Sequence, residues 1–190
     1  MKNIILIRPP LITPYNHITM AQGTPSIGVA YLSSSIKLAG YKSIIIDTAG
    51  QAPRATRYML KRLHNELNLP VYIMTDGDVY GEHIAMVIVS GSAGAAHLRE
   101  LTVPSAKWLG IWASDIDKYK LPTIPMTDID IKRISELKRD PRYKKGIWNK
   151  ELDVFMNIKK KCELEAFSKY GLTTIVDKYL PEKLEQAKSM

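Results

Sequence analysis

Residues 70–81, PVYIMTDGDVYG, decide the fold and carry the clearest chemical signal in the chain. The apolar run over residues 71–74 is rich in strand formers, which is typical of a short strand buried on both faces of a parallel sheet. Two aspartates follow the run, Asp76 and Asp78, with Gly77 between them. We expect their carboxylates at the carboxyl end of the strand, where open α/β sheets bind ligands.

Two interpretations of this acidic pair stay open from the residues alone. Magnesium prefers hard oxygen ligands and is often held by one or two carboxylates with water and phosphate oxygens, which suits Asp76 and Asp78. Alternatively, Asp76 caps a turn and Asp78 caps the next helix. Glu82 and His83 follow closely on that helix, and we expect Glu82 to face solvent.

Strand and helix patterns alternate on both sides of this stretch. They predict an α/β fold with a doubly wound parallel sheet in a three-layer α/β/α arrangement, followed by extra C-terminal helices. The expected strands cover residues 3–7, 43–47, 70–75 and 107–111. The expected helices cover residues 27–39, 54–68, 80–90, 114–119, 127–139, 149–170 and a short last segment that ends before Pro181, with a frayed tail after it.

The charge balance is compatible with an anionic partner, although many soluble proteins are equally basic without binding one. The 190 residues carry a formal net charge of +8, which is compatible with nucleic acid. Within the predicted helix over residues 54–68, a basic face is a candidate for nonspecific DNA binding, and the alternative is a solvated surface. Its residues are Arg54, Arg57, Lys61 and Arg62.

Other classes of site find no support in the sequence. The single cysteine, Cys162, excludes a disulfide framework and is expected to be a buried thiol. The histidines are scattered, and neither a phosphate-binding glycine loop nor a nucleophile elbow is present. No apolar run reaches membrane-spanning length. We therefore expect a soluble, intracellular protein without a membrane partner, and the oligomeric state is left open.

Several long stretches of the second part of the chain resemble a known family. They are GQAPRATRYMLKRLHNELNLPVYIMTDGDVYG, LTVPSAKWLGIWASDIDKYKLPTIPMTDIDIKR, DPRYKKGIW and ELEAFSKYGLTTIVDKYLPEKL. Residues 50–188 resemble the Toprim domain and C-terminal part of the A subunit of archaeal DNA topoisomerase VI. The resemblance implies a Toprim, flavodoxin-like module that holds magnesium for DNA cleavage and rejoining, with Asp76 and Asp78 on the family's DxD motif.

The first 49 residues differ from that family. Its first strand ends in a glutamate that completes the metal site, whereas here the strand ends in Arg8 and no acidic residue precedes Asp47. The winged-helix domain that supplies the family's DNA-attacking tyrosine is also expected to be missing. Residues 1–49 instead resemble the start of a cobalamin-binding domain of radical-SAM enzymes, through IILIRPP, PSIGVAYLSSSIKLAGY and SIIIDTAG. No DxHxxG motif supplies an axial histidine, so cobalamin binding is not expected.

Together the two resemblances predict an engineered chimera of fold fragments, joined near residues 48–51 into one globular domain. We expect no complete catalytic function. Magnesium should bind weakly or not at all at Asp76 and Asp78, because one carboxylate is missing and the Arg8 guanidinium is placed nearby. The alternatives are a magnesium-dependent, DNA-binding or DNA-cleaving Toprim fragment and a cobalamin-binding module.

Overall fold

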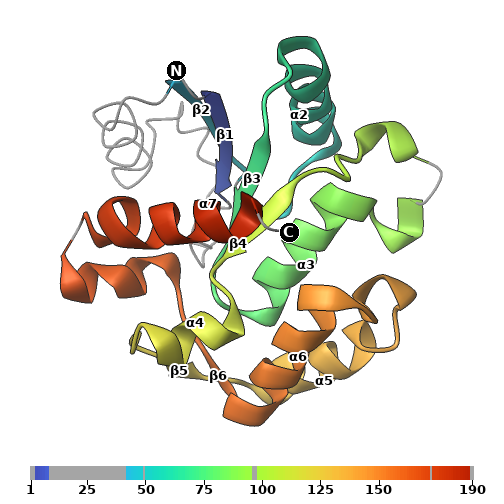
Figure 1. Ribbon diagram of the computed structural model, residues 1–190. Helices are drawn as coiled ribbons and strands as arrows, with labels where there is room; N and C mark the ends of the chain where they lie inside the picture. Colours follow the sequence, from blue (N-terminus) through green and yellow to red (C-terminus); the bar gives the residue numbers. More distant parts are fainter. Residues whose placement is uncertain (1–2, 9–41, 49, 96–97, 172, 189–190) are drawn as a thin grey trace, which may run out of the picture.

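A computed structural model describes residues 3–8, 42–48, 50–95, 98–171 and 173–188, and Figure 1 shows the arrangement. Its centre is a four-stranded sheet in the order β2-β1-β3-β4, in which all neighbouring strands run parallel. The strands are β1 Asn3–Arg8, β2 Lys42–Asp47, β3 Val71–Met74 and β4 Lys107–Gly110. All four predicted strands are therefore confirmed, and so is the Toprim-like α/β class.

The strand order creates a ligand-binding position beside β3. β1 pairs with β2 on one side and with β3 on the other, so the winding direction reverses between β1 and β3. In doubly wound sheets, ligands bind outside the carboxyl ends of the strands at such a switch point. Ile7 of β1 lies opposite Ile73 of β3, which brings the ends of both strands to the same edge of the sheet.

The sheet buries both of its faces. Along β3, Val71 and Ile73 belong to one apolar cluster, which also contains Leu60 of the helix after β2. Met74 belongs to a second and larger cluster, together with Phe155 and many other side chains of the C-terminal half. Because successive strand residues point to opposite faces, this alternation places a core on each side of the sheet and gives the predicted three layers.

The helical segments follow the predicted order up to residue 137. The longer helices are α2 Arg54–Leu67, α3 Val79–Ser90, α4 Ala113–Lys118, α5 Asp128–Leu137, α6 Gly146–Ile158 and α7 Leu180–Lys188. Short turns and a small antiparallel pair complete the described chain: η1 Ala93–Ala95, η2 Arg99–Leu101, η3 Pro141–Tyr143, η4 Leu164–Tyr170, η5 Ile175–Tyr179, and β5 Ile124–Pro125 with β6 Lys160–Lys161. The predicted helix over residues 27–39 lies outside the described residues. Among those described, no helix is long and apolar enough to cross a membrane.

Two predictions for the C-terminal part are wrong. The single helix expected over residues 149–170 is divided, because Lys159 adopts a left-handed conformation at φ 50° and ends α6. The chain then pairs with β5 before it turns into η4. The tail after Pro181 is helical up to Lys188 rather than frayed, since proline is tolerated in the first turn of a helix and the next turn buries Lys183.

Candidate functional site

The loop that carries the acidic pair is fixed between β3, β4 and the segment after β6. Thr75 donates its backbone N–H to the Gly110 carbonyl at 2.7 Å, and Ile111 returns a bond of the same length to the Thr75 carbonyl. Gly77 and Cys162 exchange two further backbone hydrogen bonds, of 2.8 and 3.0 Å. The segment after β6 therefore acts as a strap that closes the loop at the carboxyl edge of the sheet.

Each aspartate of the pair accepts a backbone hydrogen bond. The Leu164 N–H donates to Oδ1 of Asp76 at 2.9 Å, across 88 positions of sequence. The Gly81 N–H donates to Oδ1 of Asp78 at 2.6 Å, and Asp78 is the N-cap of α3. The helix-cap interpretation of Asp78 is thus correct, and it is compatible with metal binding because a carboxylate has a second oxygen.

Two glycines allow the chain to pack this closely. A Cβ atom at Gly77 would lie 2.7 Å from the Cys162 sulfur and 3.2 Å from the Ile111 side chain. A Cβ atom at Gly81 would lie 2.3 Å from the Asp76 carbonyl oxygen. The glycine inside DGD is therefore required by its contact with the strap, and Gly81 lets the first turn of α3 approach the loop.

The electrostatic surroundings of Asp78 are mixed. Burial raises the pKa of its carboxyl, while the Gly81 N–H and the charge of Lys161 oppose that shift. The Lys161 ammonium lies 2.9 Å from Oδ2 of Asp130 near the start of α5. Asp130 balances part of the Lys161 charge and itself acts on Asp78 in the opposite direction, so this ion pair beside the acidic pair is a feature that the sequence did not predict.

The pair has two carboxylates and no third acidic or histidine ligand among the described residues. β1 does lie beside β3, as the prediction about Arg8 assumed, and Arg8 is its last residue. Two half-buried carboxylates at a switch point fit Mg²⁺ bound partly through water or phosphate oxygens. Asp76 and Asp78 are thus the residues that would hold such an ion.

Glu82 does not face solvent, contrary to expectation. It is fully buried, and neither of its carboxyl oxygens has a hydrogen-bond partner in the part of the chain that the structure describes. Burial, with a smaller contribution from Glu151, raises its pKa to about 9. Glu82 is therefore a protonated, neutral acid at pH 7, and it cannot act as a third metal ligand without leaving the core.

A second buried polar cluster ties α4 to the C-terminal helix. Lys183 and Asp115 are both almost completely buried and form an ion pair of 2.6 Å. Tyr179 donates its hydroxyl to the same carboxylate at 2.7 Å, and Glu151 accepts two bonds from Ser114. The sequence does not predict this cluster, because Lys183 lies in the tail that the sequence predicts to be frayed. The cluster stabilises the packing of the C-terminal helix against α4.

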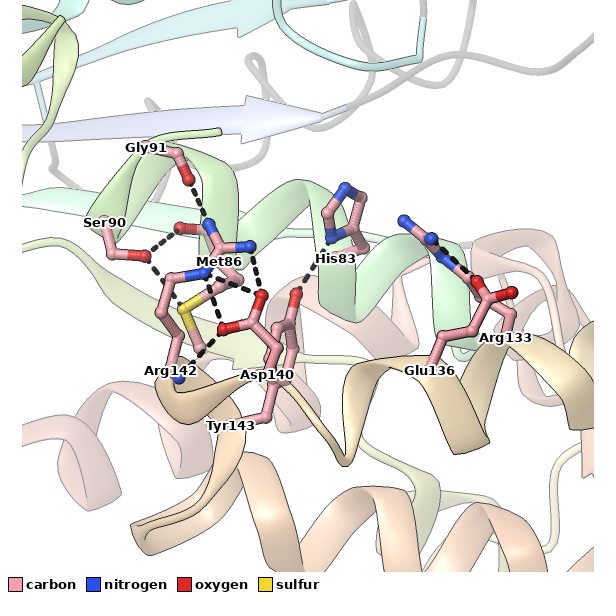
Figure 2. A network of polar contacts seen from close by, with 9 residues as sticks. All are labelled: His83, Met86, Ser90, Gly91, Arg133, Glu136, Asp140, Arg142 and Tyr143. Atoms are coloured by element: carbon pink, nitrogen blue, oxygen red, sulfur yellow. Dashed lines mark hydrogen bonds and ion pairs between the residues drawn. The ribbon is translucent and has the colours of Figure 1, made fainter. Parts of the chain in front are cut away.

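Figure 2 shows a third polar group, between α3 and η3. The ring of His83 lies 2.9 Å from the Tyr143 hydroxyl. Burial and two nearby arginines lower the pKa of His83 to about 4, and burial raises the pKa of Tyr143. The imidazole is therefore neutral at pH 7, and a hydrogen bond joins its Nδ1 to the phenol oxygen. The Arg142 guanidinium donates hydrogen bonds to both oxygens of the Asp140 carboxylate and to the Gly91 carbonyl. These bonds hold η3 against the end of α3.

The four basic residues predicted to contact DNA are not equivalent on α2. Arg57 is buried, at 6% exposure. Arg62 forms an exposed ion pair with Glu66 at 2.7 Å. Arg54 is exposed and Lys61 is half-buried. The four cations therefore do not form a continuous basic face on this helix. Arg57 points into the core, and the charge of Arg62 is paired with that of Glu66.

A doubly wound parallel sheet with an acidic pair at its switch point places this chain in the class of α/β domains that bind ligands at the carboxyl edge of the sheet. Comparison with known proteins makes the class specific. This chain belongs to the family described as the Toprim domain shared by Spo11 and the topoisomerase 6 A subunit, whose model matches residues 30–184. The matched range includes Asp76 and Asp78, the residues that follow β3 at the edge of the sheet.

Curated relatives support the same assignment. The chain is 54% identical over 146 residues to the type 2 DNA topoisomerase 6 A subunit of Methanothermobacter thermautotrophicus, which covers 76% of this chain and 41% of that protein. It is 44% identical over 147 residues to the same subunit of Archaeoglobus fulgidus, covering 77% of this chain and 41% of the relative. The chain therefore spans about two fifths of the length of these relatives.

The prediction of an engineered chimera is wrong. The family match begins at residue 30 and continues through the supposed junction at residues 48–51. β2 therefore belongs to the Toprim family rather than to a grafted unit, and the match gives no support to a cobalamin-binding origin. The βαβ pattern misleads the interpretation because many doubly wound folds begin with the same apolar strand and amphipathic helix.

Proposed function

We propose that this chain is the magnesium-holding Toprim part of the A subunit of a topoisomerase VI and acts on duplex DNA. The observation that carries the proposal is the position of Asp76 and Asp78, at the carboxyl end of β3 and at the switch point of the sheet. The relatives are DNA topoisomerase subunits by name. Magnesium, when bound, would neutralise charge on a DNA phosphate and orient it for cleavage and rejoining.

The residues themselves divide this task. Asp76 and Asp78 supply hard oxygen ligands, and the backbone donors of Leu164 and Gly81 fix the direction of each carboxylate. The strap through Cys162 keeps the loop in place. This preorganisation reduces the cost of ordering the site when a metal ion and a phosphate arrive together.

Magnesium binding to the protein alone should be weak. Two carboxylates are present, β1 ends in Arg8 where the family resemblance implies a glutamate, and Lys161 adds a positive charge nearby. A DNA phosphate supplies further oxygen ligands and negative charge, so DNA and magnesium should bind cooperatively. By linkage, the factor by which magnesium strengthens DNA binding equals the factor by which DNA strengthens magnesium binding.

Contacts on α2 can contribute to DNA binding only through its accessible cations. Arg54 and Lys61 remain candidates for nonspecific phosphate contacts, whereas the burial of Arg57 removes it from that surface. Their contribution should decline with rising salt, since phosphate contacts release counterions.

A DNA-binding assay with and without magnesium tests the proposal. The double variant Asp76→Asn, Asp78→Asn keeps an acceptor oxygen at both positions, and asparagine is as good an N-cap as aspartate, so folding should be retained. Magnesium should strengthen the binding of a labelled duplex to the wild-type protein and have no such effect on the variant. The double variant Asp117→Asn, Asp128→Asn removes two exposed carboxylates from α4 and α5 and is the charge-matched control. An equal magnesium response in all three proteins contradicts the proposal.

A further inference from the structure

Most of the net positive charge of the chain is concentrated in one short segment. Between residues 132 and 150, lysine and arginine occupy eight positions and acidic residues two, which leaves +6 of the chain's +8. This segment covers the end of α5, η3 and the start of α6. Such a concentration of cations in one segment is typical of nucleic-acid binding.

The cations of this segment fall into two groups with different roles. Three of them are engaged in ion pairs: Arg133 with Glu136, Lys138 with Asp153 and Arg142 with Asp140. Five are exposed and form no ion pair with any described residue, and we call them the basic corner. They are Lys132, Arg139, Lys144, Lys145 and Lys150.

The backbone under the basic corner is firmly held. Arg142 joins η3 to Asp140 and to the carbonyl of Gly91 at the end of α3, as Figure 2 shows. Tyr143 is completely buried, and its hydroxyl reaches His83. The exposed lysines that flank this anchored turn therefore stand on a rigid support, which lowers the entropic cost of presenting them to a ligand.

Four of the five cations of the basic corner follow the far end of α5, the helix that starts near the acidic pair, and Lys132 lies within it. Asp130, near the start of α5, forms an ion pair of 2.9 Å with Lys161, and the next residue, Cys162, exchanges backbone hydrogen bonds with Gly77 between the two aspartates. α5 has 10 residues, so its axis covers about 15 Å at 1.5 Å per residue. At 3.4 Å per base pair, this length corresponds to about four base pairs of duplex DNA.

The exposed surface of this segment favours DNA over a protein partner. None of the large exposed apolar side chains of the described chain falls between residues 132 and 150. Protein interfaces bury an apolar or aromatic centre, whereas contacts to the phosphate backbone need only positive and polar groups. The chemistry of the corner therefore matches a sugar-phosphate backbone.

We propose that the basic corner binds the phosphate backbone of duplex DNA whose reacting phosphate lies at the site of Asp76 and Asp78, so that one duplex follows α5, a helix about as long as four base pairs. The proposal rests on the proposed function and names a binding surface for it. It also moves the main electrostatic contact away from α2, to a turn between α5 and α6 on another part of the molecule (Figure 1).

Two charge-matched double variants test the basic corner. Lys144→Gln with Lys145→Gln removes two exposed cations from the corner, and Lys169→Gln with Lys178→Gln removes two exposed cations from the η4 and η5 region. Binding of a labelled duplex is followed by fluorescence anisotropy in EDTA across a range of salt. The corner variant should bind more weakly, and the slope of log K against log salt should fall by about 2, near 0.9 for each lost contact. The control variant should keep the wild-type slope.

The outcomes separate this proposal from the proposed function. Equal losses in both variants would show an effect of net charge alone and contradict the basic corner. An unchanged salt slope in the corner variant also contradicts DNA binding by the basic corner. That result leaves the proposed magnesium site intact if magnesium still strengthens DNA binding through Asp76 and Asp78. Displacement of the DNA by poly-glutamate at equal charge concentration would assign the corner to acidic proteins instead. Melting curves of both variants should match the wild type, because all four lysines are exposed.

Discussion

Glu82 gives the sharpest quantitative prediction, because a buried acid without a partner makes stability depend on pH. Its side chain is fully buried, and its pKa rises from 4.5 to about 9 through burial first and Glu151 second. Between these two values the folded protein keeps a proton that the unfolded chain releases. The free energy of unfolding should therefore fall as pH rises through this window, and the loss is complete above about pH 9.

The variant Glu82→Gln isolates this effect. Glutamine has the shape of the protonated acid and does not titrate, so both proteins should be similarly stable near pH 5. The wild-type protein loses about 1.4 kcal/mol of its free energy of unfolding for each pH unit in the window. At pH 7 the variant should therefore be more stable than the wild type by about 3 kcal/mol. The size of this difference follows the pKa of Glu82 in the folded protein.

Urea unfolding followed by circular dichroism at several pH values measures the difference directly. The exposed Glu136→Gln on α5 is the control for the loss of a carboxylate that is not buried. A Glu82→Gln difference that is constant from about pH 5 to about pH 9 would refute the reasoning, because it would mean that Glu82 ionises normally in the folded protein.

Three other predictions concern the loop and its supports. Lys183→Met should destabilise the fold by about 3–5 kcal/mol by leaving the buried Asp115 carboxylate without its ammonium partner; the exposed Lys178→Met is the control, and similar melting temperatures for both variants would contradict this. The Cys162 thiol is 2% exposed and burial raises its pKa to about 12, so it should react with a thiol reagent only as fast as the protein unfolds; rapid labelling of the native protein would show that the strap opens. Gly81→Ala should abolish the magnesium response in DNA binding, since its Cβ would lie 2.3 Å from the Asp76 carbonyl oxygen; a retained response would mean that the loop tolerates the shift.

The central sheet can be predicted from the sequence because its strands are short apolar runs with clear ends. β3 and the acidic pair emerge together, since the carboxyl end of a buried parallel strand is where such ligands occur. The N-cap role of Asp78 is likewise one of the two interpretations that the residues allow. Strand ends and helix caps depend on residues that are close together in the chain, so they can be predicted from a single sequence.

The remaining features depend on contacts between distant segments. Glu82 lies on α3, where apolar side chains surround the helix and do not reveal which face is buried. Its burial is determined by the packing of the core around it. The end of α6 at Lys159 follows from pairing with β5, across more than thirty positions of sequence. Lys183 resembles part of a frayed tail in the sequence because its partner, Asp115, lies far earlier in the chain.

The measurement that tests the central claim most directly is a magnesium titration of the ¹⁵N-labelled protein followed by NMR. If Asp76 and Asp78 hold the ion, the amide signals of Gly77 and Gly81 should shift with millimolar affinity, because the set of two carboxylates is incomplete without phosphate. The shifts should vanish in the Asp76→Asn, Asp78→Asn variant. Unchanged signals at Gly77 and Gly81, or shifts that persist in the variant, would contradict the assignment of this loop as the metal site.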